Sequence, residues 1–188
     1  GAHGWPAASD GRMCGPNRAL RDLVQDTILS LSEADVAALG IDRDRLREAI
    51  VAAFSAKADG RSDVAVKSTI LIAPGHLFQA KPGILHDAGL AGMKWFGLVP
   101  TRAREGPSIT STILVSAVRS GALLAIVGGD WITAERTAAM SAIAARKLAR
   151  QASVRIGFVG AGVQGASHLH ALPRVLPNLA HAVVCSRT

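Results

Sequence analysis

A glycine-rich turn near the C-terminal end of the chain constrains the fold more than any other feature. The apolar segment 154–159 runs directly into Gly160-Ala-Gly-Val-Gln-Gly165, and segment 166–172 has helical character. In a strand–turn–helix unit with this spacing, the first glycine makes a tight turn, the second admits a pyrophosphate, and the third lets helix and strand pack closely. The helix N-terminus adds unpaired N–H groups. We predict a dinucleotide site; a Gly-rich turn without a ligand is the alternative.

The residues after a second predicted strand, 182–185, bear on the choice of dinucleotide. An NAD-binding unit usually places Asp or Glu about 20 residues after the glycines, where it binds the ribose 2′-hydroxyl. Ser186, Arg187 and Thr188 stand there instead, with no acidic residue. A Ser-Arg pair suits a 2′-phosphate, so we expect NAD or NADP with NADP favoured. Alternatively, Arg187 is only a solvated loop residue.

The predicted nucleotide unit is short. It holds one strand, one helix and a second strand, whereas a complete dinucleotide-binding fold has two βαβαβ halves. Parallel sheets are also normally covered on both faces and extended by further strands. We therefore expect this chain to be part of a longer polypeptide.

Composition narrows the class of partner. The net charge is +7, but the arginines are scattered, tyrosine is absent and aromatic residues make up only 4% of the chain. Without aromatic stacking platforms, binding to single-stranded nucleic acid has little support. Anionic small ligands account for the charge more simply. We expect no nucleic-acid partner.

Three further features indicate a protein of the reducing cytoplasm. No apolar run approaches the ~18 residues of a membrane span, and residues 1–12 do not form a secretory signal. The two cysteines, Cys14 and Cys185, have neither metal-ligand nor disulfide spacing. We expect Cys185 to be a buried strand residue, and we expect no metal site and no membrane partner.

Hydrophobic patterning and turn residues predict an α/β fold: a mixed or antiparallel sheet domain followed by the start of a Rossmann domain. We expect an extension at 1–26, a sheet domain at 27–132, a connecting helix at 133–152 and the nucleotide-binding part at 153–188. Ser32 and Asp42 should begin helices ending near Gly40 and Gly60. The second helix should bury one apolar face, and Thr133 should cap the connecting helix with Glu135 in its first turn. The buried face comprises Leu46, Ile50, Ala53 and Phe54; strands are expected at 27–31, 64–67, 77–81, 92–96, 111–115 and 123–127.

Several short motifs, in shared order and spacing from about Leu31 to Thr188, resemble the ornithine cyclodeaminase/mu-crystallin family. They are Leu31–Val36, Ala91–Trp95, Gly106–Ser108, Ile132–Ala139, Gly160–Gln164 and Ser186–Thr188. The resemblance implies a homodimer whose sheet domain binds an amino or imino acid and whose Rossmann domain binds NAD or NADP. Family enzymes pass a hydride between nicotinamide and the substrate α-carbon.

The resemblance also assigns roles to individual residues. Lys94 matches a lysine that anchors the substrate carboxylate, although a snorkelling strand lysine would look the same. Lys67 falls where the family places a second basic ligand, often arginine, whose bidentate fork a lysine cannot reproduce. Arg136 and Thr137 match a pair that touches substrate and cofactor. The cofactor-binding set that the resemblance implies is Ser108, Arg136, Thr137, Gly160, Gly162, Val163, Gln164, Gly165, Ser186, Arg187 and Thr188.

Two departures from the family pattern affect the expected substrate. Lys81 stands where the cyclodeaminase itself tends to carry methionine. A cation there disfavours the ammonium tail of ornithine and suits a second carboxylate, provided that Lys81 does not point to solvent. The family's catalytic aspartate would lie beyond Thr188, so the sequence names no general acid or base.

Three functions follow from the resemblance. We expect the chain to belong to an enzyme acting on the C–N bond of an amino acid, such as a cyclodeaminase that converts ornithine to proline and ammonia. Alternatively, it belongs to an NADP-linked imino-acid reductase or secondary-amine dehydrogenase, which Lys81 and Arg187 favour slightly. The third reading is a crystallin-like protein that binds the nucleotide without turnover.

Overall fold

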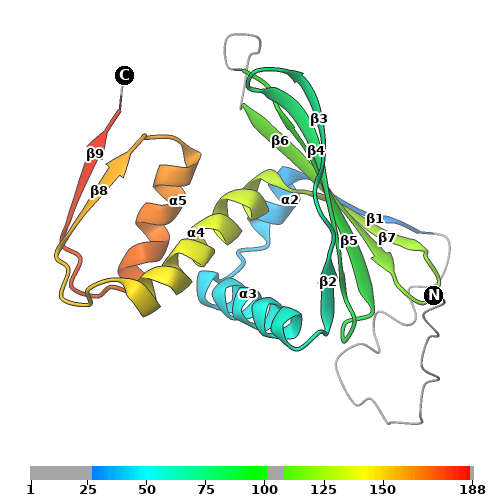
Figure 1. Ribbon diagram of the computed structural model, residues 1–188, viewed down its shortest axis with the longest axis horizontal. Coiled ribbons are helices and arrows are strands. Elements are labelled where there is room, and N and C mark those ends of the chain that lie inside the picture. The colour runs from blue at the N-terminus through cyan, green and yellow to red at the C-terminus, as the bar shows by residue number, and fades with distance from the viewer. Residues whose placement is uncertain (1–26, 101–107, 187–188) are drawn as a thin grey trace.

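The computed structural model describes residues 27–100 and 108–186. A strongly twisted sheet and a small two-stranded sheet lie on opposite sides of a long helix, which connects them (Figure 1). The fold is α/β, as the sequence predicts. Within the described ranges, no helix is both long and apolar enough to cross a bilayer.

The larger sheet has seven strands in the order β1-β7-β6-β5-β4-β2, with β3 also paired to β4. Every pairing is antiparallel except that of β1 with β7. The predicted mixed sheet is therefore confirmed. The strands are β1 (Leu29–Leu31), β2 (Ser62–Val64), β3 (Ser68–Ala73), β4 (His76–Leu85), β5 (Leu90–Leu98), β6 (Ile109–Ala117) and β7 (Leu123–Gly128).

The segment before β4 differs from the predicted strand at 64–67. β2 ends at Val64 and β3 begins at Ser68, so residues 65–67 lie between two strands that both pair with β4. Pro82 of β4 lies opposite this gap, where its missing N–H removes no ladder hydrogen bond. β3 was not predicted, although Pro74 and Gly75 (φ +75°) mark the tight turn that joins it to β4.

Two helices lie between β1 and β2 in the chain. Ser32 and Asp35 form the predicted capping box at the start of α2 (Glu33–Ala38), and Asp42 caps α3 (Arg43–Ala58). The predicted buried face of α3 is only partly correct. Leu46 and Ile50 are half-buried, whereas Ala53 and Phe54 are exposed, because the described part of the chain packs only the first half of this face.

The connecting helix α4 (Asp130–Leu148) begins earlier than predicted. Gly129 is the N-cap, so Thr133 does not cap the helix and Glu135 lies beyond its first turn. The cap comes from elsewhere, because the Glu33 carboxylate accepts hydrogen bonds from the Asp130 and Trp131 backbone N–H groups at 2.7 and 3.1 Å. A distant acidic residue thus replaces the local cap that the sequence suggests.

The second sheet forms a βαβ unit from β8 (Arg155–Val159), α5 (Val163–Ala171) and β9 (His181–Cys185), with β8 and β9 parallel. α5 begins at Val163 rather than 166, so Gly165 lies inside the helix. A short 3-10 helix, η2 (Leu172–Arg174), follows α5, and a small core that includes alanines of α4 and α5 lets the two helices approach closely. This core comprises Ala138, Ala142, Ala171, Val175 and Leu176.

The expectation that Cys185 is buried is wrong. Cys185 is exposed, like the rest of β9. The reason is that β9 is an edge strand: within the described part of the chain, it pairs only with β8.

Candidate functional site

A row of lysines crosses the larger sheet. Lys81 of β4 and Lys94 of β5 are directly opposite each other in the ladder, so their side chains share one face. Their Nζ atoms lie 4.9 and 5.2 Å from the centre of the Phe96 ring, within the range of a cation–π contact. Lys67 directly precedes β3, beside Lys81. Three predicted substrate-binding residues are therefore neighbours on one sheet face.

The N-terminal turns of α4 approach the same face. Lys94 Nζ donates to Thr133 Oγ1 at 3.0 Å, and Ser111 Oγ lies 3.2 Å from the same hydroxyl. Asp130 Oδ1 accepts from the Ser111 backbone N–H at 2.5 Å and from its hydroxyl at 3.1 Å. These contacts fix Lys94 against α4 and occupy the Asp130 carboxylate. Sequence reasoning assigned no role to Ser111 or Asp130.

Arg136 completes the cationic cluster, which we define as Lys67, Lys81, Lys94 and Arg136. Its guanidinium is half-buried, and Nη1 lies 3.7 Å from the thioether sulfur of Met140. Among the residues that the structure describes, no carboxylate forms an ion pair with any member of the cluster. The cluster therefore concentrates positive charge without a direct counter-ion.

The pKa values reflect this crowding. Burial lowers the pKa of Lys94 from 10.5 to about 8, with smaller contributions from Arg136 and Lys81 that Asp130 partly offsets. Burial, Arg136 and Lys67 also lower the pKa of Lys81. Burial lowers the pKa of Arg136. Each lowered pKa means that the surroundings destabilise the charged form of that side chain. A bound anion would stabilise the charged form again.

The glycine turn has the geometry that a dinucleotide requires. Gly160 has φ +107°, and a Cβ on Gly165 would lie 2.9 Å from the Gly160 carbonyl oxygen, so the turn itself requires both glycines. Nothing lies within 4 Å of a Cβ placed on Gly162. That open space leaves room for a pyrophosphate. No side chain caps α5, so the N–H groups that start it, Val163 and Gln164 among them, point to this space.

A histidine links the glycine turn to α4. His168 Nδ1 is 2.6 Å from the Gln164 carbonyl oxygen, which can only accept, so Nδ1 carries the proton. His168 Nε2 then accepts from the Ser141 hydroxyl at 2.8 Å. The sequence did not single out either residue, although a histidine one helical turn after Gln164 was visible.

The other predicted cofactor residues have less defined surroundings. Thr137 Oγ1 donates to the Thr133 carbonyl oxygen at 2.6 Å within α4. The Ser108 carbonyl oxygen accepts from the Val99 N–H at 2.8 Å, just before β6. Ser186 is exposed at the end of β9. Arg187 and Thr188 lie outside the described residues. Of the Ser186-Arg187 pair on which the NADP preference depends, the structure therefore describes only Ser186.

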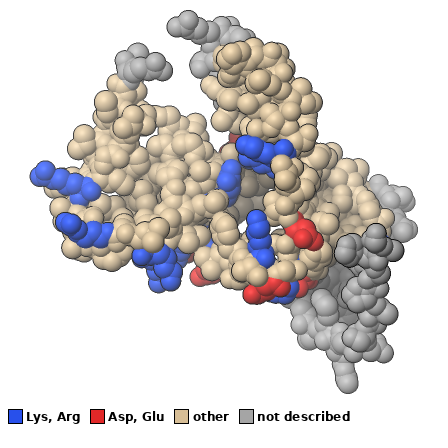
Figure 2. All heavy atoms as spheres, in the orientation of Figure 1, with Lys and Arg blue, Asp and Glu red and all other residues tan. Residues whose placement is uncertain are grey.

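The larger sheet and the βαβ unit lie on two sides of one opening. In Figure 1 the N-terminal ends of α4 and α5 point in the same general direction, with the sheet on one side and the βαβ unit on the other. Figure 2 shows a V-shaped notch between these two lobes, with Lys and Arg atoms gathered near its base. A substrate on the sheet and a dinucleotide on the glycine turn would thus face each other across it.

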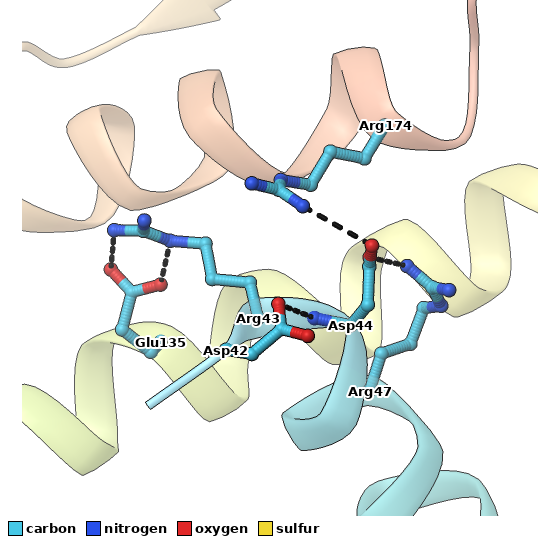
Figure 3. A network of polar contacts seen from close by, with 6 residues as sticks. All are labelled: Asp42, Arg43, Asp44, Arg47, Glu135 and Arg174. Carbon is cyan, nitrogen blue, oxygen red and sulfur yellow. Dashed lines mark hydrogen bonds and ion pairs between the residues drawn. The ribbon is translucent and has the colours of Figure 1, made fainter. Parts of the chain in front are cut away.

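A separate polar network holds the lobes together below the notch. Glu135 of α4 is buried and accepts from Arg43 Nε and Nη2 of α3 at 2.7 and 3.2 Å (Figure 3). Asp44 binds Arg47 at 2.5 Å and Arg174 of the βαβ unit at 3.2 Å. This network orients α4 through Glu135. Arg136 of the cationic cluster directly follows Glu135 in the same helix. Within the described ranges, no cluster of His, Cys, Asp and Glu could hold a metal ion.

Several known proteins are similar to this chain in fold and sequence. The Δ1-pyrroline-2-carboxylate reductase of Thermococcus litoralis, solved with NADH and L-proline, is 31% identical with a TM-score of 0.80 over 86% of this chain and 50% of its own. An archaeal alanine dehydrogenase, solved as a dimer with bound NAD, is 29% identical with a TM-score of 0.77, over 85% and 48% of the two chains.

The iminosuccinate reductase of Paracoccus denitrificans is 31% identical over 152 residues, which are 79% of this chain and 47% of the relative. Its structure with NAD+ has a TM-score of 0.73 and covers 86% of this chain and 50% of its own. The chain thus spans about half the length of these relatives. Residues 28–187 match the sequence pattern common to the ornithine cyclodeaminase/mu-crystallin family. The chain therefore belongs to the ornithine cyclodeaminase/mu-crystallin family.

Proposed function

We propose that this chain is the substrate-binding part and the beginning of the nucleotide-binding part of an NAD(P)-dependent enzyme that acts on an amino or imino acid. The observation that carries the proposal is the half-buried pair Lys94 and Arg136, which forms no ion pair with a carboxylate in the described chain, in a molecule that also holds an open glycine turn at the start of α5. The relatives named above are a Δ1-pyrroline-2-carboxylate reductase with bound L-proline, an alanine dehydrogenase and an iminosuccinate reductase. An α-carboxylate is common to the compounds in these names.

Lys94 and Arg136 would hold that carboxylate. Because Thr133 fixes the Lys94 ammonium, the bound acid would present its α-carbon in a restricted orientation. Positioning of this kind supplies a large part of the rate when the cofactor performs the chemistry. Lys67, in the segment between β2 and β3, would add long-range electrostatic attraction for the bound acid.

The glycine turn would hold the cofactor. Gly160, Gly162 and Gly165 shape the backbone, and the N–H groups of Val163 and Gln164 would bind phosphate oxygens. A bound nicotinamide supplies a site that accepts or returns a hydride. Arg136, Thr137 and Ser108 would contact the cofactor from the side of the sheet.

NADP remains our proposed cofactor, with NAD as the alternative. Ser186 directly follows β9, where the ribose would lie, and residues 166–188 contain no acidic side chain. The solved relatives carry NADH or NAD+, which supports the alternative. Steady-state rates with each cofactor in the full-length protein would decide between them.

We also propose a homodimer. The dimeric alanine dehydrogenase supports it, as do apolar side chains on β3 such as Ile70 and Ile72, which are 57% and 55% exposed. Light scattering on the full-length protein measures the state directly. A monomer at micromolar concentration would contradict this part of the proposal.

The function is tested by turnover of the full-length protein with L-amino acids and cyclic imino acids, each with NAD(H) and NADP(H). Lys94→Met should lower kcat/KM by about 10- to 100-fold, because it removes one charge-assisted contact. Lys147→Met, which changes an exposed lysine near the C-terminal end of α4, should leave kcat/KM unchanged. Nucleotide binding without turnover would support the crystallin-like alternative instead.

A further inference from the structure

The cationic cluster holds more positive charge than one carboxylate can balance. Lys67, Lys81, Lys94 and Arg136 contribute four formal charges, and Asp130, whose Oδ1 accepts hydrogen bonds from Ser111, partly offsets the unfavourable surroundings of Lys94. A substrate with a single carboxylate would leave most of this repulsion in place. The excess is therefore an observation that the proposed function does not explain.

The positive charge beyond what one carboxylate can balance comes mainly from Lys81. Its side chain is half-buried on the same face as Lys94, above the Phe96 ring, rather than directed to solvent. Adjacent strands are about 4.8 Å apart, and directly opposite side chains stay at a similar separation. Two ammonium groups at this spacing suit the two acid groups of a short dicarboxylic acid.

The surroundings of the two lysines divide their roles. Lys94 is fixed by Thr133 on α4, beside Arg136, and so belongs to the α-carboxylate end. Lys81 faces Lys67, which lies in the gap between β2 and β3. An ammonium tail, as in ornithine, would meet Lys81 and Lys67 with like charge. A carboxylate tail would be attracted to them.

Building on the function proposed above, we propose that the substrate is a dicarboxylic amino or imino acid whose second carboxylate binds Lys81 and Lys67. In the oxidative direction the α-C–H bond breaks and its electron pair leaves with hydrogen as hydride to NAD(P)+. The amino nitrogen releases one proton to water, and a C=N bond forms. The second carboxylate is unchanged and serves only for recognition.

The first experiment measures substrate preference in the full-length protein at fixed ionic strength. L-Aspartate and L-glutamate are compared with L-alanine and L-ornithine, using wild type and Lys81→Met. The proposal expects kcat/KM for a dicarboxylic substrate to exceed that for alanine, and Lys81→Met to lower the dicarboxylic value about 10- to 100-fold with little effect on alanine. Lys81→Arg should retain most of the preference, and Lys147→Met should change nothing.

The second experiment measures binding without turnover. Calorimetry with succinate and with butyrate, which differ by one carboxylate, should show tighter binding of succinate, and Lys81→Met should remove the difference. Equal affinities, or a preference that survives in Lys81→Met, would overturn the dicarboxylate assignment even if the enzyme is active on monocarboxylates. Selective succinate binding without turnover of any acid would instead overturn the proposed reaction and keep the dicarboxylate site.

Discussion

At the scale of single residues, Lys94 is poorly suited to stability and well suited to binding. Its pKa falls from 10.5 to about 8 because the fold buries its charge beside Arg136 and Lys81. Between these pH values the unfolded chain binds more protons than the folded one, so the contribution of Lys94 to folding stability rises with pH from about 8 to 10.5. Below pH 8 the cost of the buried charge is fully present.

Lys94→Met should therefore stabilise the full-length protein while it impairs anion binding. We expect the free energy of unfolding at pH 7 to rise by about 0.5–1 kcal/mol, since solvent screening and the lost Thr133 hydrogen bond reduce the gain. Urea unfolding at pH 7 and pH 10 measures it, and the difference from wild type should shrink at pH 10. A destabilised variant with unchanged anion affinity would show that Lys94 is a structural residue.

The same residue predicts how anion binding depends on pH. An acid binds the protonated ammonium, so affinity for succinate or butyrate should fall as pH rises through about 8, by up to about tenfold per pH unit above it. Lys94→Arg should keep its affinity to higher pH because a guanidinium stays charged. Calorimetry from pH 6.5 to 9.5 at constant salt checks this. A flat profile in wild type would mean that other groups dominate.

At the scale of elements, the start of α4 depends on a residue from α2. Glu33 accepts from the Asp130 and Trp131 N–H groups, and Gly128 lets the start of α2 approach, since a Cβ on Gly128 would lie 2.7 Å from the Glu33 backbone nitrogen. α4 carries Thr133 and Arg136 in its first two turns. Glu33 therefore supports the site without belonging to the cluster.

Glu33→Ala should cost about 1–2 kcal/mol of stability, the range of a lost N-cap, and should raise KM for the acid substrate. The matched control is Ser32→Ala, which removes only the local cap of α2 and should cost about 0.5–1 kcal/mol without moving KM. Chemical unfolding and steady-state kinetics on the full-length protein measure both. Equal KM effects from the two variants would argue against a specific link between Glu33 and the site.

The elements also show what the sequence can predict. Local signals were sufficient for the Ser32 capping box, the Asp42 cap and the strand–glycine turn–helix unit, because each depends on residues that are close together in the sequence. The start of α4 was misplaced since its cap comes from Glu33, about 97 positions earlier. The gap between β2 and β3 depends on pairing with β4, which no local window contains.

The candidate site was predicted by family motifs rather than by local patterns. Lys81, Lys94 and Arg136 are spread over two strands and a helix, and only the antiparallel register brings the lysines opposite each other. The hydroxyls that support Lys94, those of Thr133 and Ser111, carry no sequence signature. Long-range packing determines such contacts, so the sequence could suggest the residues but not their arrangement.

At the scale of the whole molecule, the Arg43–Glu135 pair connects the early helices to α4. Removing Arg43 leaves a buried carboxylate without its partner, whereas Glu135→Gln leaves an arginine that is 34% exposed and can reach water. We expect Arg43→Ala to cost about 2–4 kcal/mol and Glu135→Gln about 1–2 kcal/mol. Arg174→Met, at an exposed pair, should cost less than about 1 kcal/mol. Denaturant unfolding ranks the three, and a reversed order would contradict this account.

The central claim is that a hydride moves between the acid held at Lys94 and a nicotinamide held at the glycine turn. The most direct measurement uses α-deuterated L-amino acids with the full-length protein and either oxidised cofactor, followed by mass spectrometry. We predict that deuterium moves to the nicotinamide ring, or remains at the α-carbon of a cyclised product when the hydride returns, and that Lys94→Met strongly reduces both. Loss of deuterium to solvent, or no label transfer with either cofactor, would contradict the account.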